Sequence, residues 1–204
     1  MSSHDNTRLE AFADGVFAIA ITLLIIEVRV PRPDGITTTA DLWHALRHIL
    51  PTVFAFVLSF AVIFITWVNH RNVLRGVRSS STPFIYANGF LLMTVVAIPF
   101  TAALLGEYIL TDHAAPAVVL YNGVIVVQGI AWLCLNHAVL SGALGRDDNA
   151  TTIFRGQRRN AVFAIALYGL LAIGAVWLPM TVAAITTLTW GFWLVLSLRL
   201  DVPA

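Results

Sequence analysis

The chain consists of long apolar stretches separated by short polar segments. A membrane-spanning helix needs about 20 predominantly apolar residues, and four stretches of roughly that length each predict one span. These four stretches run from about Ala11 to Val30, His48 to His70, Phe84 to Leu105 and Ala115 to Leu140. A fifth stretch, from Ala161 to Leu198, is longer than the others.

This fifth stretch is too long for a single crossing. Its 38 residues carry no charge, and as one helix they would extend about 57 Å, nearly twice the roughly 30 Å hydrocarbon core. Pro179 lies near the middle and cannot donate a helix hydrogen bond, so we expect two spans joined by a tight turn at Leu178–Pro179. The pattern then predicts six transmembrane helices in one domain, residues 1–204. Their approximate bounds are 7–30, 46–73, 84–106, 115–140, 157–178 and 180–199.

The composition favours an all-α polytopic membrane protein. Apolar residues make up 58% of the chain and charged residues only 11%, with a mean hydropathy of +0.82, whereas an average soluble domain is roughly one quarter charged. These values exclude a soluble globular domain, a disordered chain and a nucleic-acid binder, and they make membrane lipids the expected surroundings. Cys134 is the only cysteine, which excludes a disulfide framework or a cysteine metal site within one chain.

The distribution of arginine predicts the orientation. If the N-terminus is cytoplasmic, nine arginines fall on the cytoplasmic side and three on the other, as the positive-inside rule requires. Six spans then place both termini in the cytoplasm of a cell-membrane protein. The nine are Arg8, Arg71, Arg75, Arg78, Arg146, Arg155, Arg158, Arg159 and Arg199, and the three are Arg29, Arg32 and Arg47.

The first apolar stretch opens with the ionisable residues Arg8, Glu10 and Asp14. A charge at the centre of a membrane helix costs about 2.5–3.5 kcal/mol on insertion scales, so Asp14 needs a partner. Arg8, or the end of the second stretch from Trp67 to Arg71, can supply it. The alternative is a partly hydrated carboxylate that complements the helix macrodipole.

The same segment resembles a known family. Arg8-x-x-x-Phe12-Ala13-Asp14 is similar to the Arg-x-x-x-Phe-Ser-Asp signature of the transmembrane protein 175 family, the endolysosomal potassium channels and their bacterial relatives. The six-span layout and the ending Trp67-x-x-His70-Arg71 extend the resemblance. Ala13 replaces the signature serine, so any hydrogen bond that the serine hydroxyl makes in the family is absent here.

The resemblance implies a potassium-permeable cation channel built as a homotetramer of single six-helix subunits, with the first helix lining a central pore. Potassium is then the permeating ion, with other monovalent cations or protons as further candidates, and no cofactor is expected. The family register places the apolar constriction at Ile19, Leu23 and Ile26, with Thr22 as the candidate for selectivity. Because no glycine-carbonyl filter is present, we expect modest selectivity for potassium.

Helical geometry is consistent with that assignment. At 100° per residue, Ile19, Leu23 and Ile26 fall within about 60° of one another, Thr22 falls at the edge of this face, and Asp14 points about 140° away from Ile19. An aliphatic stripe of this kind also suits lipid contact or helix packing. Thr22 has the alternative role of bonding the Ala18 carbonyl.

Other polar residues of the predicted channel have two interpretations each. Glu27 lies near the outer mouth, where it would attract cations or pair with Arg29 or Arg32. By resemblance, His70, Arg71 and Trp67 belong with Arg8, Phe12 and Asp14 to an inter-helix network at the cytoplasmic end, and His70 is also a candidate for a pH response.

The polar residues also suggest two other functions. A proton-coupled secondary transporter would use Asp14 and His70, although carriers usually place such groups near the midplane, where this chain has no ionisable residue. A membrane enzyme at the Arg8, Asp14, His70 and Arg71 cluster would lack a nucleophile or metal set beside it, so we expect no enzyme. His44 and His48 have a spacing suited to a metal, but without an evident third ligand we expect an ordinary interfacial helix.

Overall fold

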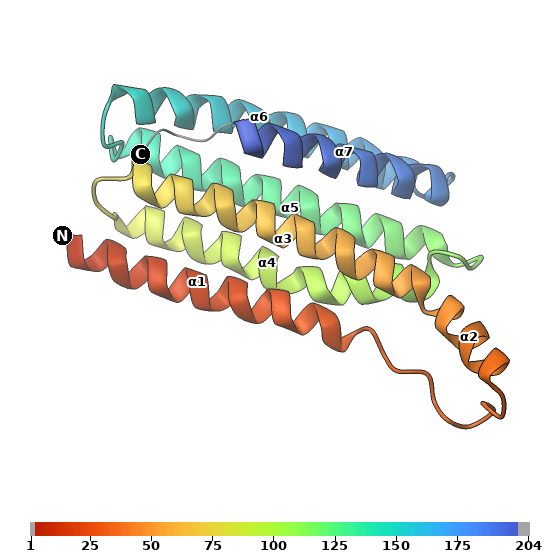
Figure 1. Cartoon of the computed structure of the whole chain (residues 1–204). Coiled ribbons are helices and arrows are strands. Elements are labelled where there is room, and N and C mark those ends of the chain that lie inside the picture. The colour runs from red at the N-terminus through yellow and green to blue at the C-terminus, as the bar shows by residue number, and fades with distance from the viewer. Residues whose placement is uncertain (1–2, 200–204) are drawn as a thin grey trace.

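The protein, described here by a computed structural model for residues 3–199 and for the side chains of residues 6–195, is all-helical (Figure 1). Its helices are α1 (Ser3–Ile26), α2 (Thr39–His48), α3 (Leu50–Gly76), α4 (Thr82–Tyr108), α5 (Ala114–Ser141), α6 (Asp148–Gly174) and α7 (Pro179–Arg199).

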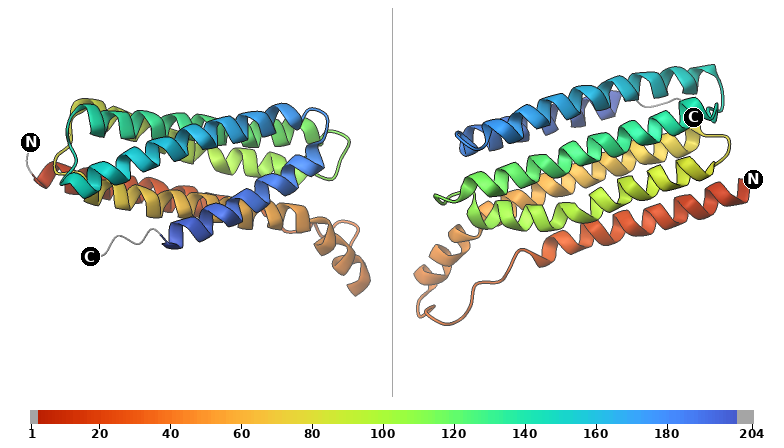
Figure 2. Two further views of the ribbon diagram at one scale, coloured as in Figure 1. Left: turned by 90° about the horizontal axis from the view of Figure 1, so that it is seen from above. Right: turned by 180° about the vertical axis from the view of Figure 1, so that it is seen from behind.

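The long helices lie side by side in a bundle, and α1 occupies one margin of it (Figures 1 and 2). α1 packs against α3 and α4, while α5 packs between α4 and α6. α7 folds back from α6 and contacts α3, α5 and α6. The short helix α2 and the loop before it project from the end of the bundle opposite the N-terminus (Figure 1).

Within the described residues, four helices are long and apolar enough to cross a membrane: α1, α3, α4 and α5. α7 runs from Pro179 to Arg199 and is apolar over Pro179–Val195, the part whose side chains the structure describes. The first half of α6 carries Arg155, Arg158 and Arg159, and its uncharged part begins only at Asn160. Within the described residues, length and composition therefore support four of the six predicted spans.

The structure corrects the first two predicted helices. α1 ends at Ile26 rather than at residue 30, and the N–H groups of Glu27 and Val28 close it with bonds to the carbonyls three residues earlier. The stretch predicted as one helix from residue 46 is divided at Ile49 into α2 and α3. Pro51 lies in the first turn of α3, where a missing N–H costs nothing.

The later helices differ less from the prediction, with one exception. α6 begins at Asp148, not near residue 157, because the Asp147 carboxylate caps it by accepting a bond from the Ala150 N–H at 2.7 Å. α6 and α7 form the tight hairpin expected at Leu178–Pro179, with α7 beginning at Pro179. A helix N-terminus tolerates proline because its first N–H groups have no intrahelical partner.

The N-terminal segment and two loops meet at one end of the bundle. The loop after α3 pairs with the loop before α6: Arg78 N–H donates to the Leu144 carbonyl and Arg146 N–H to the Gly76 carbonyl. The Asn6 amide also donates to the Val77 carbonyl. This end thus gathers the segments that carry most of the arginines assigned to the cytoplasm, whereas the Arg199 side chain lies outside the described residues.

Candidate functional site

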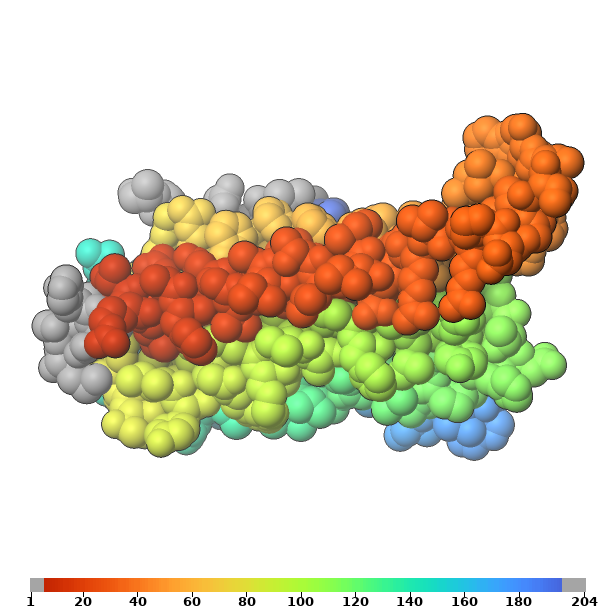
Figure 3. All heavy atoms as spheres, turned by 90° about the horizontal axis from the view of Figure 1, so that it is seen from below, coloured from red at the N-terminus to blue at the C-terminus, as the bar shows by residue number. Residues whose placement is uncertain are grey.

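α1 presents two faces of different character. Ala13, Phe17, Ala20 and Leu24 are fully buried against the bundle, at the spacing of three and four residues that defines one helix face. The opposite face is open along the length of the molecule, as Figure 3 shows for the red helix between α3 and α4. The sequence alone could not say which face would be covered, because nearly every residue of α1 after Asp14 is apolar.

The predicted constriction residues lie on the open face of α1. Ile19, Leu23 and Ile26 are 60%, 40% and 66% exposed in the single chain. Phe12, further toward the N-terminus, is exposed as well. The subunit therefore leaves this aliphatic stripe available for lipid or for other subunits.

Thr22 lies beside this stripe and is also exposed. Its hydroxyl donates to the carbonyl of Ile19 at 2.9 Å, so the predicted backbone bond is formed three residues back rather than to Ala18. Because the hydroxyl hydrogen is donated to the backbone of the same helix, the lone pairs of the oxygen can accept a bond from another partner.

Glu27 follows the last residue of α1 and is half-buried. The predicted pairing with Arg29 or Arg32 is not formed among the residues that the structure describes. Glu27 lies at the C-terminal end of α1, where unsatisfied carbonyls carry the negative end of the helix macrodipole.

Asp14 is held by α3. The Trp67 indole N–H donates to Asp14 Oδ1 at 2.8 Å, and the Arg71 guanidinium carbon lies 5.8 Å from the centre of the Trp67 ring. The partner therefore comes from the predicted segment Trp67 to Arg71 and not from Arg8, which is exposed near the start of α1. This contact fixes the rotation of α1 relative to α3.

His70 bonds a residue that the sequence analysis missed. It is buried, and its Nε2 atom lies 2.5 Å from Oδ1 of Asn88 in α4. Its ring packs against Phe17 of α1, with centroids 5.4 Å apart. His70 thus connects α1, α3 and α4, and it forms no hydrogen bond with Asp14, contrary to the single cluster expected from sequence. The only available signal was the position of Asn88, a polar residue within an apolar stretch.

The two histidines of α2 whose spacing suits a metal, His44 and His48, contact each other in the structure. Their rings pack edge to face, with centroids 4.5 Å apart. Asp41, three residues before His44 in the sequence, instead accepts bonds from Thr37 and from the Thr38 N–H, while its own N–H donates to the Thr38 hydroxyl in a capping box. These bonds from Thr38 and Thr37 lower the pKa of Asp41 to about 2.

Comparison with known proteins finds a family match over the part of the chain that contains α1 and α3. Residues 8–99 match the model of the family described as endosomal/lysosomal potassium channel TMEM175. A protein from Streptomyces collinus named potassium channel is 43% identical over 133 residues, 65% of this chain and 63% of that protein. A potassium channel from Chamaesiphon minutus is 43% identical over 138 residues, 67% and 68% of the two chains. The aligned part thus spans about two thirds of these relatives.

A solved structure covers more of the chain. The crystal structure titled a lysosomal potassium-selective channel TMEM175 homolog from Chamaesiphon minutus superposes with a TM-score of 0.81 and 32% sequence identity. The superposition covers 96% of this chain and 99% of that one. The likeness therefore extends beyond residues 8–99 to α5, α6 and α7.

Proposed function

Because the chain belongs to the TMEM175 family, we propose that it is a potassium-permeable cation channel with an apolar constriction on α1. The observation that carries the proposal is the uncovered stripe of Ile19, Leu23 and Ile26, on the face of α1 that its own subunit leaves open. Such a stripe is costly in water but suits a symmetric assembly around a pore or a lipid surface. The names of the family and of the relatives favour the pore.

The proposed assembly is a homotetramer of subunits with six membrane crossings, in which α6 and α7 complete the crossings as a hairpin. Four copies of Ile19 would form a ring narrow enough to exclude water, and a small rotation or splay of α1 would admit it. The Asp14–Trp67 bond restrains that rotation at the N-terminal end. The C-terminal carbonyl end of α1, with Glu27 beside it, favours a cation at the opposite mouth.

Thr22 is the proposed selectivity residue. With its hydrogen donated to Ile19, its oxygen offers lone pairs to a partly dehydrated cation. Four hydroxyls and no glycine-carbonyl filter support only modest selectivity of potassium over sodium. We place both termini in the cytoplasm, since the arginine-bearing loops gather at the end where α1 begins.

The test is potassium flux into liposomes containing the purified protein. Ile19→Asn should raise the flux above wild type, because an amide in the ring stabilises water within the constriction. The matched control is Ile25→Asn, an equally apolar and exposed position on α1 that lies about 120° around the helix from Ile19. The control should leave the flux unchanged. No flux above empty vesicles in wild type and in Ile19→Asn would refute the channel proposal.

A further inference from the structure

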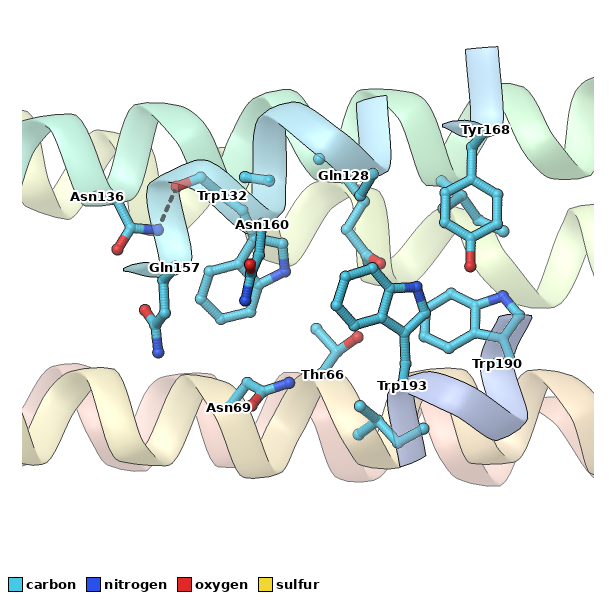
Figure 4. Close-up of a pocket in the computed structure, with 15 residues that line it drawn as sticks. Thr66, Asn69, Gln128, Trp132, Asn136, Gln157, Asn160, Tyr168, Trp190 and Trp193 are labelled. Atoms are coloured by element: carbon cyan, nitrogen blue, oxygen red, sulfur yellow. Dashed lines mark hydrogen bonds between the residues drawn. The ribbon is translucent and has the colours of Figure 1, made fainter. Parts of the chain in front are cut away.

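A cavity lined by both amide and aromatic side chains lies within the single subunit, away from the open face of α1. It has a volume of about 140 Å³, is lined by residues of α3, α5, α6 and α7, and is partly open to the surface of the chain (Figure 4). Five amide side chains line it: Asn69, Gln128, Asn136, Gln157 and Asn160. So many amides around one space are unexpected in the interior of a membrane bundle, where polar groups are expensive and usually functional.

Several of these polar groups have no partner. Among the described side chains, five buried polar atoms lack a hydrogen bond, and four of the five belong to residues that line this cavity. The four atoms are Gln128 Nε2, Asn136 Oδ1, Gln157 Oε1 and Trp190 Nε1. Gln128, Asn136 and Trp190 are only 3%, 1% and 8% exposed, so bulk water does not satisfy them. Buried polar groups in native proteins are normally bonded, which points to an occupant.

The lining defines the chemistry of that occupant. The cavity is walled by the rings of Trp132, Tyr168, Trp190 and Trp193, and none of its lining residues is charged. Tyr168 and Trp190 stack on each other with centroids 6.0 Å apart. The unpartnered atoms include both donors and acceptors. A neutral molecule with one aromatic ring, one donor and one acceptor matches this set, whereas an ion would enter without a counter-charge.

The volume agrees with a ligand of this size. A buried cavity of about 150 Å³ accommodates benzene when its lining is apolar. We propose that this cavity is a binding site for a small uncharged aromatic molecule bearing a hydrogen-bond donor and acceptor, such as an aromatic amide. The site belongs to one subunit, so it requires neither the pore nor the tetramer.

Benzamide is a suitable probe, because it has one ring, an N–H donor and a carbonyl acceptor. We expect isothermal titration of the detergent-solubilised full chain with benzamide to show saturable binding of one molecule per chain, after subtraction of empty micelles. Gln128→Met and Asn136→Leu keep the side-chain size but remove the unpartnered atoms, and each should weaken binding at least tenfold. Thr94→Val, a buried change in α4 whose hydroxyl bonds only the Leu91 carbonyl, is the matched control and should bind as wild type does.

A second measurement needs no variant and therefore no assumption about folding. Nuclear Overhauser contacts from the benzamide ring should reach indole protons of Trp132, Trp190 or Trp193 in the wild-type protein. The proposal is overturned by non-saturable heat, by unchanged affinity in both cavity variants, or by contacts only to tryptophans outside the cavity. A dry or water-filled cavity would give the first of these results. Flux measurements do not enter this test, so the channel proposal can stand or fall separately.

Discussion

At the scale of single residues, Trp67 is the clearest link between α1 and the rest of the subunit. Its indole N–H bonds Asp14 of α1, and its ring faces the Arg71 guanidinium. Asp14 therefore does not sit in the bilayer as an isolated charge. The tryptophan satisfies one carboxylate oxygen and, since Asp14 is exposed, leaves the remaining lone pairs accessible to solvent.

Replacing this tryptophan isolates the contribution of its N–H. The Trp67 and Phe64 ring centroids are 5.6 Å apart. Trp67→Phe keeps an aromatic ring against Phe64 but removes the donor to Asp14. We expect destabilisation of about 1 kcal/mol, the usual net worth of one hydrogen bond, measured by thermal unfolding in detergent. Trp43→Phe in α2, where the ring is exposed, is the control. Equal shifts for the two variants would mean that the bond to Asp14 contributes nothing.

Residue-scale contacts were also the least predictable from sequence. The sequence predicts Asp14, His70 and Arg8 in one cluster, but the His70 ring bonds Asn88 and Arg8 is exposed. The partners of a buried polar group come from other helices, and their positions depend on how those helices rotate. For the same reason the cavity amides Gln128 and Gln157 could not be grouped, since Gln128 is a lone polar residue in the apolar run of α5 and Gln157 lies in the polar and basic segment of α6.

At the scale of helices, close packing of α3 on α4 depends on one glycine. A Cβ at Gly106 would lie 2.7 Å from the Thr52 Cα atom, which is backbone and cannot rotate away. Gly106→Ala should therefore push the helices apart and cost about 1–3 kcal/mol. Gly89→Ala, in the same helix with nothing within 4 Å of its Cβ, should instead stabilise by about 0.5–1 kcal/mol. Thermal unfolding of the two variants in detergent should show shifts of opposite sign.

Helix α2 depends on its cap. Because the native pKa of Asp41 is about 2, below the ordinary 3.8, its carboxylate stabilises the folded state above pH 3.8, and this stabilisation is lost as the pH falls from 3.8 through 2. An NMR titration in micelles should show the Thr37 and Thr38 amide signals shifting with a midpoint near 2. Thr38→Val should move the midpoint toward 3.8. A midpoint near 3.8 in wild type would show that the capping box does not form in solution.

Helix boundaries illustrate what the apolar pattern can and cannot predict. The pattern located α4 and α5 to within two residues at either end, because polar turn residues border them closely. It missed the early start of α6, since residues 148–159 are polar and basic and read as a loop. Their helix is set by the Asp147 cap and by packing on α5. The early end of α1 was missed as well, because Val28 and Val30 continue the apolar run beyond the last helical turn.

At the scale of the whole molecule, the open face of α1 requires a covering partner, and cysteine chemistry can identify it. The chain has one cysteine, Cys134, which is exposed, so Cys134→Ser provides a background without thiols. Ile19→Cys on that background places one thiol per subunit on the proposed pore axis. A disulfide forms only when two Cα atoms approach within about 4.4–6.8 Å, which neighbouring subunits reach at a constriction but separate chains in lipid do not.

We therefore expect mild oxidation of Ile19→Cys in membranes to give covalent dimers on a denaturing gel, since each subunit of a fourfold ring can pair with one neighbour. Ile25→Cys, on a different face of α1, should remain monomeric under the same treatment. Native mass spectrometry of the unmodified protein should report four chains. If Ile25→Cys cross-links and Ile19→Cys does not, the face of α1 proposed for the pore instead contacts lipid, and the constriction would have to be sought on another helix.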